Sequence, residues 1–330
     1  MTVLVTGGAG YIGAHVVRLL QRRGSQVVVV DDLSTGSVGR VGDVPLISID
    51  IAAADARDQL ATTMSEHEVD SVIHVAAKKQ VGESTARPAW YYHKNVGGTA
   101  NLLLAMQQAQ VTKMMFSSSA ATYGLPDLPE GSLIHEDAGN RPISPYGETK
   151  LVCEWMIRAA GPAWGLRSVN LRYFNVAGAG WDDLGDPGIF NLIPIVMRQL
   201  LTGEKPQIFG DDYPTPDGTC VRDYVHVIDL ADSHLAALDF LDRADRAYDV
   251  FNVGTGTGAS VIEVLGQVAE STGYSVEPVV IARRPGDPAS LVADVTRIQD
   301  VLGWKASNSD LATIVDSAWS AWPAIHGPTS

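Results

Sequence analysis

The sequence is constrained most by one junction near its start, where a short apolar strand runs into a glycine-rich turn and then into a helix. Residues 2–6 read TVLVT, and glycines follow at positions 7, 10 and 13. Gly7 suits a tight turn, Gly10 lets the backbone approach a ligand, and Gly13 allows the helix to pack closely on the sheet. The helix then presents N–H groups and the positive end of its dipole at one point. This arrangement predicts a pyrophosphate-binding turn.

The first half of the chain continues the alternation of strand and helix. Runs that are rich in Val and Ile and apolar throughout favour strands buried on both faces. We expect strands at 2–6, 26–31, 44–50, 70–76, 113–117 and 167–174, with helices that end at 23 and cover 54–66 and 89–110. Such alternation implies right-handed crossovers. The predicted fold is therefore α/β, with a Rossmann-type doubly wound parallel sheet.

The second half has a different rhythm. Glycine and proline become frequent after Val176, and long loops are expected around 210–218. A chain of 330 residues is long for one core. We expect a nucleotide-binding domain at 1–175 and a smaller C-terminal substrate-binding α/β domain at 176–330. A strand near 249–255 is expected to return to the first domain.

Charge and cysteine content restrict the partners. The net charge of −14 argues against nucleic-acid binding. Cys153 and Cys220 are too few for a disulfide framework and have no metal-ligand spacing, so we expect a reducing cytoplasm and no metal. The first apolar run reads as a strand rather than a signal peptide, and no run approaches the roughly 18 apolar residues of a membrane span.

The second predicted strand carries a carboxylate at its end. Asp31 follows Gly13 by 18 residues, where an acidic side chain accepts the hydroxyls of a ribose. A carboxylate there disfavours a 2′-phosphate, so the predicted cofactor is NAD rather than NADP. Asp50 and Ile51 end the third strand, where an adenine has room, although Asp50 also suits a loop cap.

A tyrosine and a lysine four positions apart open a later predicted helix. Tyr146 and Lys150 share one face at this spacing. An unperturbed tyrosine titrates near 10, too high for a base at neutral pH. A nearby ammonium and an oxidised nicotinamide favour the phenolate. Ser119, at the end of a preceding strand, is placed to hydrogen-bond the reacting hydroxyl, and the trio predicts hydride chemistry on a bound hydroxyl.

At this point the chain resembles the extended short-chain dehydrogenase/reductases and, within them, the UDP-galactose 4-epimerase family. The resemblance covers essentially the whole chain. Its specific stretches are 6–13 (TGGAGYIG), 81–84 (VGES), 116–119 (FSSS), 145–150 (PYGETK), 171–175 (LRYFN), 221–226 (VRDYVH) and 283–287 (RRPGD). The resemblance implies a reversible inversion at C4 of UDP-glucose and UDP-galactose through a 4-keto sugar, with NAD tightly bound, in a homodimer.

The resemblance also implies a set of site residues. Tyr146, Lys150 and Ser119 are the expected catalytic residues. The expected cofactor contacts, besides Tyr146 and Lys150, are Gly7, Gly10, Tyr11, Ile12, Gly13, Asp31, Asp32, Asp50, Ile51, Lys79, Asn95 and Phe174. Lys79 suits a phosphate or ribose contact, and a solvated surface lysine is the equal alternative.

A UDP-sugar site is expected in the second half. A diphosphate favours guanidinium groups, and Arg222 and Arg284 are the candidates. Asp287 is expected to accept a uridine ribose hydroxyl, and Leu291 falls where the family gates sugar size. Ser119 is also expected at the sugar, and Asn175, Asn191 and Phe209 are expected at the phosphates or the base.

The sequence departs from the family at three places and leaves other activities open. Residues 75–79 read VAAKK where the family often has Phe-Ala-Gly-x-Lys. A threonine near the sugar is displaced to Thr122, and Lys94 replaces one asparagine of a pair. The alternatives are an epimerase that acts on UDP-N-acetylhexosamines, a dehydratase, a reductase and a silent NAD sensor. Residues 120–122 hold no acid pair for a dehydratase, Asp31 argues against a reductase that uses NADPH, and the intact Tyr146 and Lys150 argue against a silent sensor.

Overall fold

The computed structural model describes residues 1–129, 131–243, 247–284 and 286–328, and the chain forms two compact units. The first unit comprises Met1–Gly124, Gly139–Arg172 and Ala231–Phe251, and the second comprises Leu125–Ala138, Tyr173–Leu230 and Asn252–Ser330. Each unit is therefore assembled from segments that are distant in the sequence.

A seven-stranded sheet forms the first unit, in the order β10-β6-β5-β4-β1-β2-β3. Its strands are β1 (Thr2–Thr6), β2 (Gln26–Asp31), β3 (Leu46–Ser48), β4 (Ser71–His74), β5 (Lys113–Ser117), β6 (Arg167–Tyr173) and β10 (Tyr248–Val253). β1 pairs in parallel with β2 on one side and β4 on the other, and β5 pairs in parallel with β4 and β6. The strand order reverses at β1, which confirms the predicted doubly wound parallel sheet.

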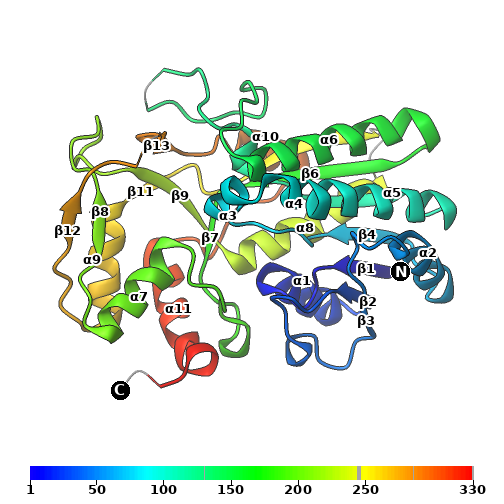
Figure 1. Cartoon of the computed structure of the whole chain (residues 1–330), viewed down its shortest axis with the longest axis horizontal. Coiled ribbons are helices and arrows are strands. Elements are labelled where there is room, and N and C mark those ends of the chain that lie inside the picture. Colours follow the sequence, from blue (N-terminus) through cyan, green and yellow to red (C-terminus); the bar gives the residue numbers. More distant parts are fainter. Residues whose placement is uncertain (130, 244–246, 285, 329–330) are drawn as a thin grey trace. The chain divides into compact units, whose positions relative to one another are not determined.

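Helices cover both faces of this sheet (Figure 1). α2 (Ala56–Glu66), α5 (Gly98–Gln108) and α6 (Pro145–Trp164) lie on one face, with the short α3 (Val81–Ala86) and α4 (Pro88–Tyr91) beside them. α1 (Tyr11–Arg22) and most of α8 (Val227–Arg243) lie on the other face, where Arg23 forms an ion pair with Asp239. The central strands of the sheet are therefore buried on both faces, as their apolar sequences predict.

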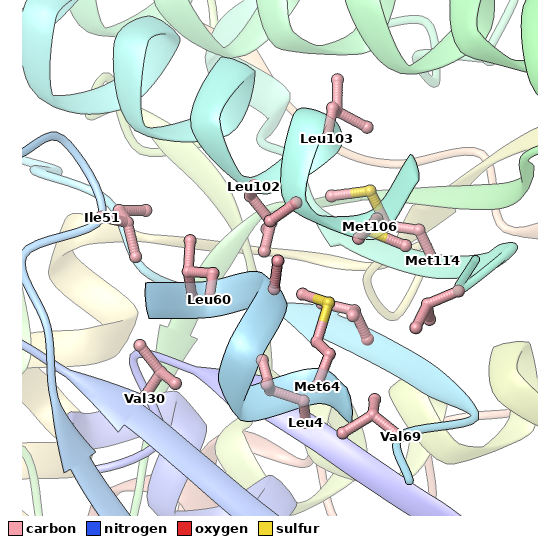
Figure 2. Close-up of a cluster of buried hydrophobic side chains, with 14 of the residues drawn as sticks. Leu4, Val30, Ile51, Leu60, Met64, Val69, Leu102, Leu103, Met106 and Met114 are labelled. Atoms are coloured by element: carbon pink, nitrogen blue, oxygen red, sulfur yellow. The ribbon is translucent and has the colours of Figure 1, made fainter. Parts of the chain in front are cut away.

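The apolar core of the first unit lies between the sheet and α2 and α5. Figure 2 shows Leu60 and Met64 of α2 near Leu102 and Met106 of α5, with Leu4 of β1 beneath them. All five side chains are essentially inaccessible to solvent. This packing fixes the strands whose ends carry the candidate site.

Several predicted elements have other bounds in the structure. The third and fourth strands are shorter than the expected 44–50 and 70–76. The helix expected over 89–110 consists of α4, a π-helical segment at Tyr92–Gly97 and α5. A π-helical turn contains an extra residue, so it rotates α5 relative to α4. Asn95 lies inside this segment and is buried.

The second unit has a smaller sheet of β11 (Gly258–Ser260), β9 (Val221–His226) and β13 (Ser290–Leu291), with β7 (Asn175–Ala177) also paired to β9. β8 (Gln207–Phe209) pairs with β12 (Val279–Ile281). An apolar cluster joins these strands to α7 (Leu192–Thr202), α9 (Val261–Thr272) and α11 (Leu311–His326), while α10 (Thr296–Leu302) follows β13. Across the described residues, no helix combines the length and apolar composition that a membrane crossing requires.

Candidate active site

The glycine turn lies at the end of β1 and leads directly into α1. Gly7 has φ +72°, and a Cβ at this position would lie 2.7 Å from the backbone nitrogen of Ala76. A Cβ on Gly13 would lie 2.0 Å from the carbonyl oxygen of Gly7. Gly10 precedes the helix without a side-chain cap, and the first turn carries no acidic side chain. The start of α1 is therefore close-packed and electrostatically suited to an anion.

Asp31 ends β2 beside this turn and is buried. Its Oδ2 accepts the N–H of Ala9 at 3.0 Å, and its Oδ1 accepts the N–H of Leu33 at 2.8 Å. Burial raises the pKa of Asp31, and these two backbone hydrogen bonds oppose that rise. A carboxylate accepts about four hydrogen bonds, so both oxygens keep acceptor capacity for hydroxyls. The adjacent Asp32 is exposed, with the Nζ of Lys78 at 3.5 Å from its Oδ2.

The other predicted cofactor residues occupy varied environments. Asp50 forms an ion pair with Lys94 and caps its own loop by accepting the N–H of Ala52 at 3.0 Å. Ile51 belongs to the apolar core of the first unit. The Nζ of Lys79 lies 5.8 Å from the ring centroid of Tyr11. Lys94, which stands where the family often has an asparagine, therefore pairs with the predicted cofactor residue Asp50.

Asn95 is fully engaged by the protein. Its Oδ1 accepts the N–H of Lys78 at 2.8 Å, and its Nδ2 donates to the Lys78 carbonyl and to Thr149 Oγ1, both at 3.0 Å. These bonds tie the loop after β4 to α6.

The two remaining apolar cofactor candidates are both buried. Ile12 lies in the first turn of α1, and Phe174 lies in the second unit.

Local sequence explains where Tyr146 and Lys150 lie. The Ser144 side chain caps α6 by accepting the N–H of Gly147 at 3.2 Å, and Pro145 occupies the first helical position, which its fixed φ favours. Tyr146 and Lys150 therefore lie in the first turns of α6 on one face. Ser119 is the second residue after the end of β5, where it caps the short turn Ala120–Thr122.

The three predicted catalytic residues come together inside the first unit. Tyr146 is buried, which raises its pKa, and a hydrogen bond with Ser119 lowers it. Lys150 is 1% exposed, and its Nζ donates to the carbonyl oxygen of Ser117 at 2.7 Å. Burial lowers the pKa of Lys150 to about 8. Burial therefore disfavours ionisation of Tyr146 to the phenolate, and the hydrogen bond with Ser119 favours it.

Two buried charged residues beside this trio were missed from the sequence. Glu154 lies one helical turn after Lys150 and forms a two-pronged ion pair with Arg172 of β6. The spacing of four between Lys150 and Glu154 was an available signal, because it places both on one face of α6. Arg172 belongs to the same LRYFN stretch as the predicted Phe174 and Asn175.

The second unit gathers most of the predicted uridine diphosphate residues. Arg222 forms an ion pair with Asp287 and lies opposite Leu291 in the register of β9 and β13. The guanidinium of Arg284 stacks on the ring of Phe209, 3.6 Å from its centroid. Two guanidinium groups, a carboxylate and an aromatic ring thus come from two strands, β8 and β9, and from the loop that follows β12.

The two predicted asparagines are exposed in the second unit. Asn175, on β7, hydrogen-bonds the hydroxyl of Tyr224. Asn191 precedes α7, and its Nδ2 lies 3.5 Å from Asp186 Oδ2. Both retain exposed polar groups that suit a ligand.

Comparison with known proteins gives consistent results. The profile of the NAD dependent epimerase/dehydratase family matches residues 3–254. A protein of Azospirillum brasilense named UDP-glucose 4-epimerase is 47% identical over 324 residues, which are 96% of this chain and 91% of that protein.

Solved structures agree with this match. UDP-glucose 4-epimerase from Brucella ovis in complex with NAD has a TM-score of 0.90 and 43% identity, over 96% of this chain and 97% of that one. The enzyme from Bifidobacterium longum in complex with NAD⁺ and UDP has a TM-score of 0.87 and 37% identity, over 98% of both chains.

Proposed function

The chain belongs to the NAD dependent epimerase/dehydratase family, and from that premise we propose that it interconverts UDP-galactose and UDP-glucose by inversion at C4. The observation that carries this proposal is the buried cluster of Ser119, Tyr146 and Lys150 in the same unit as the glycine turn. The solved relatives that share the fold bind NAD, or NAD⁺ and UDP.

The first unit fits NAD. The start of α1 suits the pyrophosphate, and Asp31 keeps acceptor capacity for a ribose. When bound, NAD supplies the chemistry of taking a hydride from C4 and returning it. Tyr146 takes the proton of the 4-hydroxyl, aided by Ser119, and the Lys150 ammonium stabilises the phenolate. Rotation of the 4-keto sugar exposes its other face, and Tyr146 returns the proton.

The second unit supplies groups for the constant part of the substrate. We assign Arg222 and Arg284 to the diphosphate and Asp287 to a ribose hydroxyl. We assign Phe209, whose ring stacks on Arg284, to the uracil. Firm binding of UDP leaves the sugar free to turn. The predicted roles of Asn175 and Asn191 remain proposals on the same basis.

The turn after β5 supports epimerisation over dehydration. A dehydratase needs an acid pair there to remove water. The short turn instead holds Ala120, Ala121 and Thr122, and the buried Thr122 hydroxyl donates to the carbonyl of Ser119 at 2.9 Å. No acidic side chain occupies this turn.

A product assay tests the proposed function. Purified protein is given UDP-galactose without added NAD, and the UDP-glucose formed is measured. We expect catalytic turnover without net change in cofactor redox state, because hydride is returned in each cycle. A parallel reaction with UDP-N-acetylgalactosamine tests the alternative that N-acetylated sugars are the main substrates, and a stable keto-deoxy product would show dehydration instead.

Two broader proposals concern the environment of the enzyme. We propose a homodimer, supported by Leu104 of α5 and Trp155 of α6, which are large, apolar and exposed on neighbouring helices. We also propose that the enzyme works in the cytoplasm, supported by the free and buried Cys153 and Cys220. Cell fractionation with an antibody to the chain tests the second proposal.

A further inference from the structure

Three successive serines at the end of β5 are each held by a different group. The carbonyl of Ser117 accepts from Lys150 Nζ, and Ser119 hydrogen-bonds Tyr146. Between them, Ser118 Oγ donates to Glu154 Oε1. All three serines are buried. The position of this short segment therefore determines whether Lys150 and Tyr146 are both in place.

Glu154 is itself held by a fork of hydrogen bonds. Arg172 Nε donates to Glu154 Oε1 at 2.9 Å, and Arg172 Nη2 donates to Oε2 at 2.6 Å. The two side chains are only 5% and 1% exposed. A buried ion pair is often no more stabilising than well-packed apolar side chains of the same volume. A contribution to folding stability is therefore a weak explanation for the presence of Glu154 and Arg172 at this buried place.

We infer that Glu154 and Arg172 are positioning residues for the proposed epimerisation, on which this inference rests. Through Ser118 they fix the segment that presents the Ser117 carbonyl to Lys150 and the Ser119 hydroxyl to Tyr146. His234 of α8 supports the same segment from another side, because its Nε2 lies 2.7 Å from Ser117 Oγ. Neither Glu154 nor Arg172 needs to touch the substrate.

The pair also acts through charge. The titratable groups around Lys150 are Tyr146, Cys153 and Glu154 on α6 and His74 on β4, with Arg172 of β6 behind Glu154. Burial lowers the pKa of His74 to about 3 and raises the pKa of Cys153 to about 11, so both are neutral near pH 7. Glu154 is then the negative charge that opposes the loss of the Lys150 proton.

Two substitutions separate position from charge. Glu154→Asp keeps the carboxylate but shortens its reach to Ser118, whereas Glu154→Gln keeps the length and an acceptor oxygen but removes the charge. Because Glu154→Gln leaves Arg172 without its counter-ion, a double variant, Glu154→Leu with Arg172→Leu, removes both charges. Asp242→Asn, in the exposed ion pair with Lys113, is the matched control.

Each variant is purified with its bound NAD, and kcat, KM and the pH profile of kcat/KM are measured. We expect Glu154→Asp and the double variant to lose kcat at least about tenfold with KM little changed, because the reacting groups are misplaced. In Glu154→Gln we expect the alkaline limb of the profile to move down by about half a pH unit or more, because Lys150 loses its proton more easily. Asp242→Asn should match the wild type.

The near-ultraviolet absorbance of tyrosinate, taken as the difference from Tyr146→Phe, gives a readout independent of turnover. We expect the Tyr146 transition to move to higher pH in Glu154→Asp and in the double variant, because the hydrogen bond from Ser119 that lowers the pKa of Tyr146 is then misplaced. Folded, NAD-loaded variants with wild-type kcat, alkaline limb and Tyr146 transition would reduce the pair to core packing and overturn the inference. Failure of the wild type to convert UDP-galactose would instead remove the proposed function, while the Tyr146 titration would still test the positioning.

Discussion

Lys150 shows, at the scale of a single residue, how a catalytic group is kept at a cost in stability. Its ammonium is almost fully buried and rests 4.8 Å from the ring centroid of Phe116. The Ser117 carbonyl and Glu154 offset part of the desolvation, yet the pKa still falls to about 8 from a usual 10.5. The folded protein therefore binds this proton less tightly than the unfolded chain does.

This difference predicts a dependence of stability on pH. Between pH 8 and 10.5 the unfolded chain holds more protons on Lys150 than the folded protein does, so the free energy of unfolding rises with pH in that window. At pH 7 we expect Lys150→Met to be more stable than the wild type by roughly 2–3 kcal/mol, after the lost hydrogen bond to Ser117 is counted. Urea denaturation at pH 7 and pH 10 measures the gap, which should shrink at the higher pH. An unchanged gap would show that Lys150 is not desolvated as described.

Leu291 carries a second prediction at this scale. It is partly buried on β13 opposite Arg222, which we assign to the diphosphate. Leu291→Ser removes several carbons from the site of the proposed sugar gate. We expect kcat/KM for UDP-N-acetylgalactosamine to rise by about tenfold or more, with a smaller change for UDP-galactose. Equal changes for both sugars would place the gate elsewhere, and Leu311→Ser, at the start of α11, tests for unspecific effects of a lost leucine.

Individual elements are determined to different degrees by the sequence. The turn between β1 and α1 and the start of α6 were predictable, because glycine, proline and serine act on the backbone within a few residues. The apolar strands were predictable because both of their faces are buried. The π-helical segment around Asn95 was not, since its extra residue has no local sequence signal.

Long-range hydrogen bonds set the remaining features. Glu154 and Arg172 are 18 positions apart and come from a helix and a strand, so only the fold brings them together. The segment 125–138 lies in the second unit, where the Ile134 carbonyl accepts from Asn252 Nδ2 at 2.7 Å. The predicted residues Arg222 and Asp287 are 65 positions apart. Their family motifs assigned both to one site, and their spacing in the sequence did not.

The glycine turn carries the prediction at the element scale. Gly13→Ala would place a Cβ 2.0 Å from the Gly7 carbonyl, so α1 must move away from the end of β1. We expect the purified variant to contain little NAD and to unfold at a lower temperature. Gly266→Ala in α9 is the control, because its Cβ would meet nothing within 4 Å and alanine favours a helix by about 0.5–1 kcal/mol. Retention of NAD by Gly13→Ala would contradict the close approach.

At the scale of the whole molecule, charge and exposed apolar surface act against each other. The net charge of −14 keeps copies of the chain apart at low ionic strength, and salt screens this repulsion over about 10 Å at 0.1 M. Apolar contact between copies gains from burial at any salt concentration. A homodimer built on apolar side chains should therefore persist, and even strengthen, as salt is added.

Trp155 provides the test of that dimer. It is 51% exposed on α6, and Leu104 on the adjacent α5 is 49% exposed. We expect light scattering after size exclusion to give a dimer mass at 0.5 M salt for the wild type and a monomer mass for Trp155→Glu, because a buried, unpaired carboxylate is costly. Phe190→Glu changes an equally exposed aromatic residue of the second unit and should leave the dimer intact. A dimer that survives Trp155→Glu but not Phe190→Glu would move the proposed interface to the second unit, and a monomeric wild type would remove the homodimer altogether.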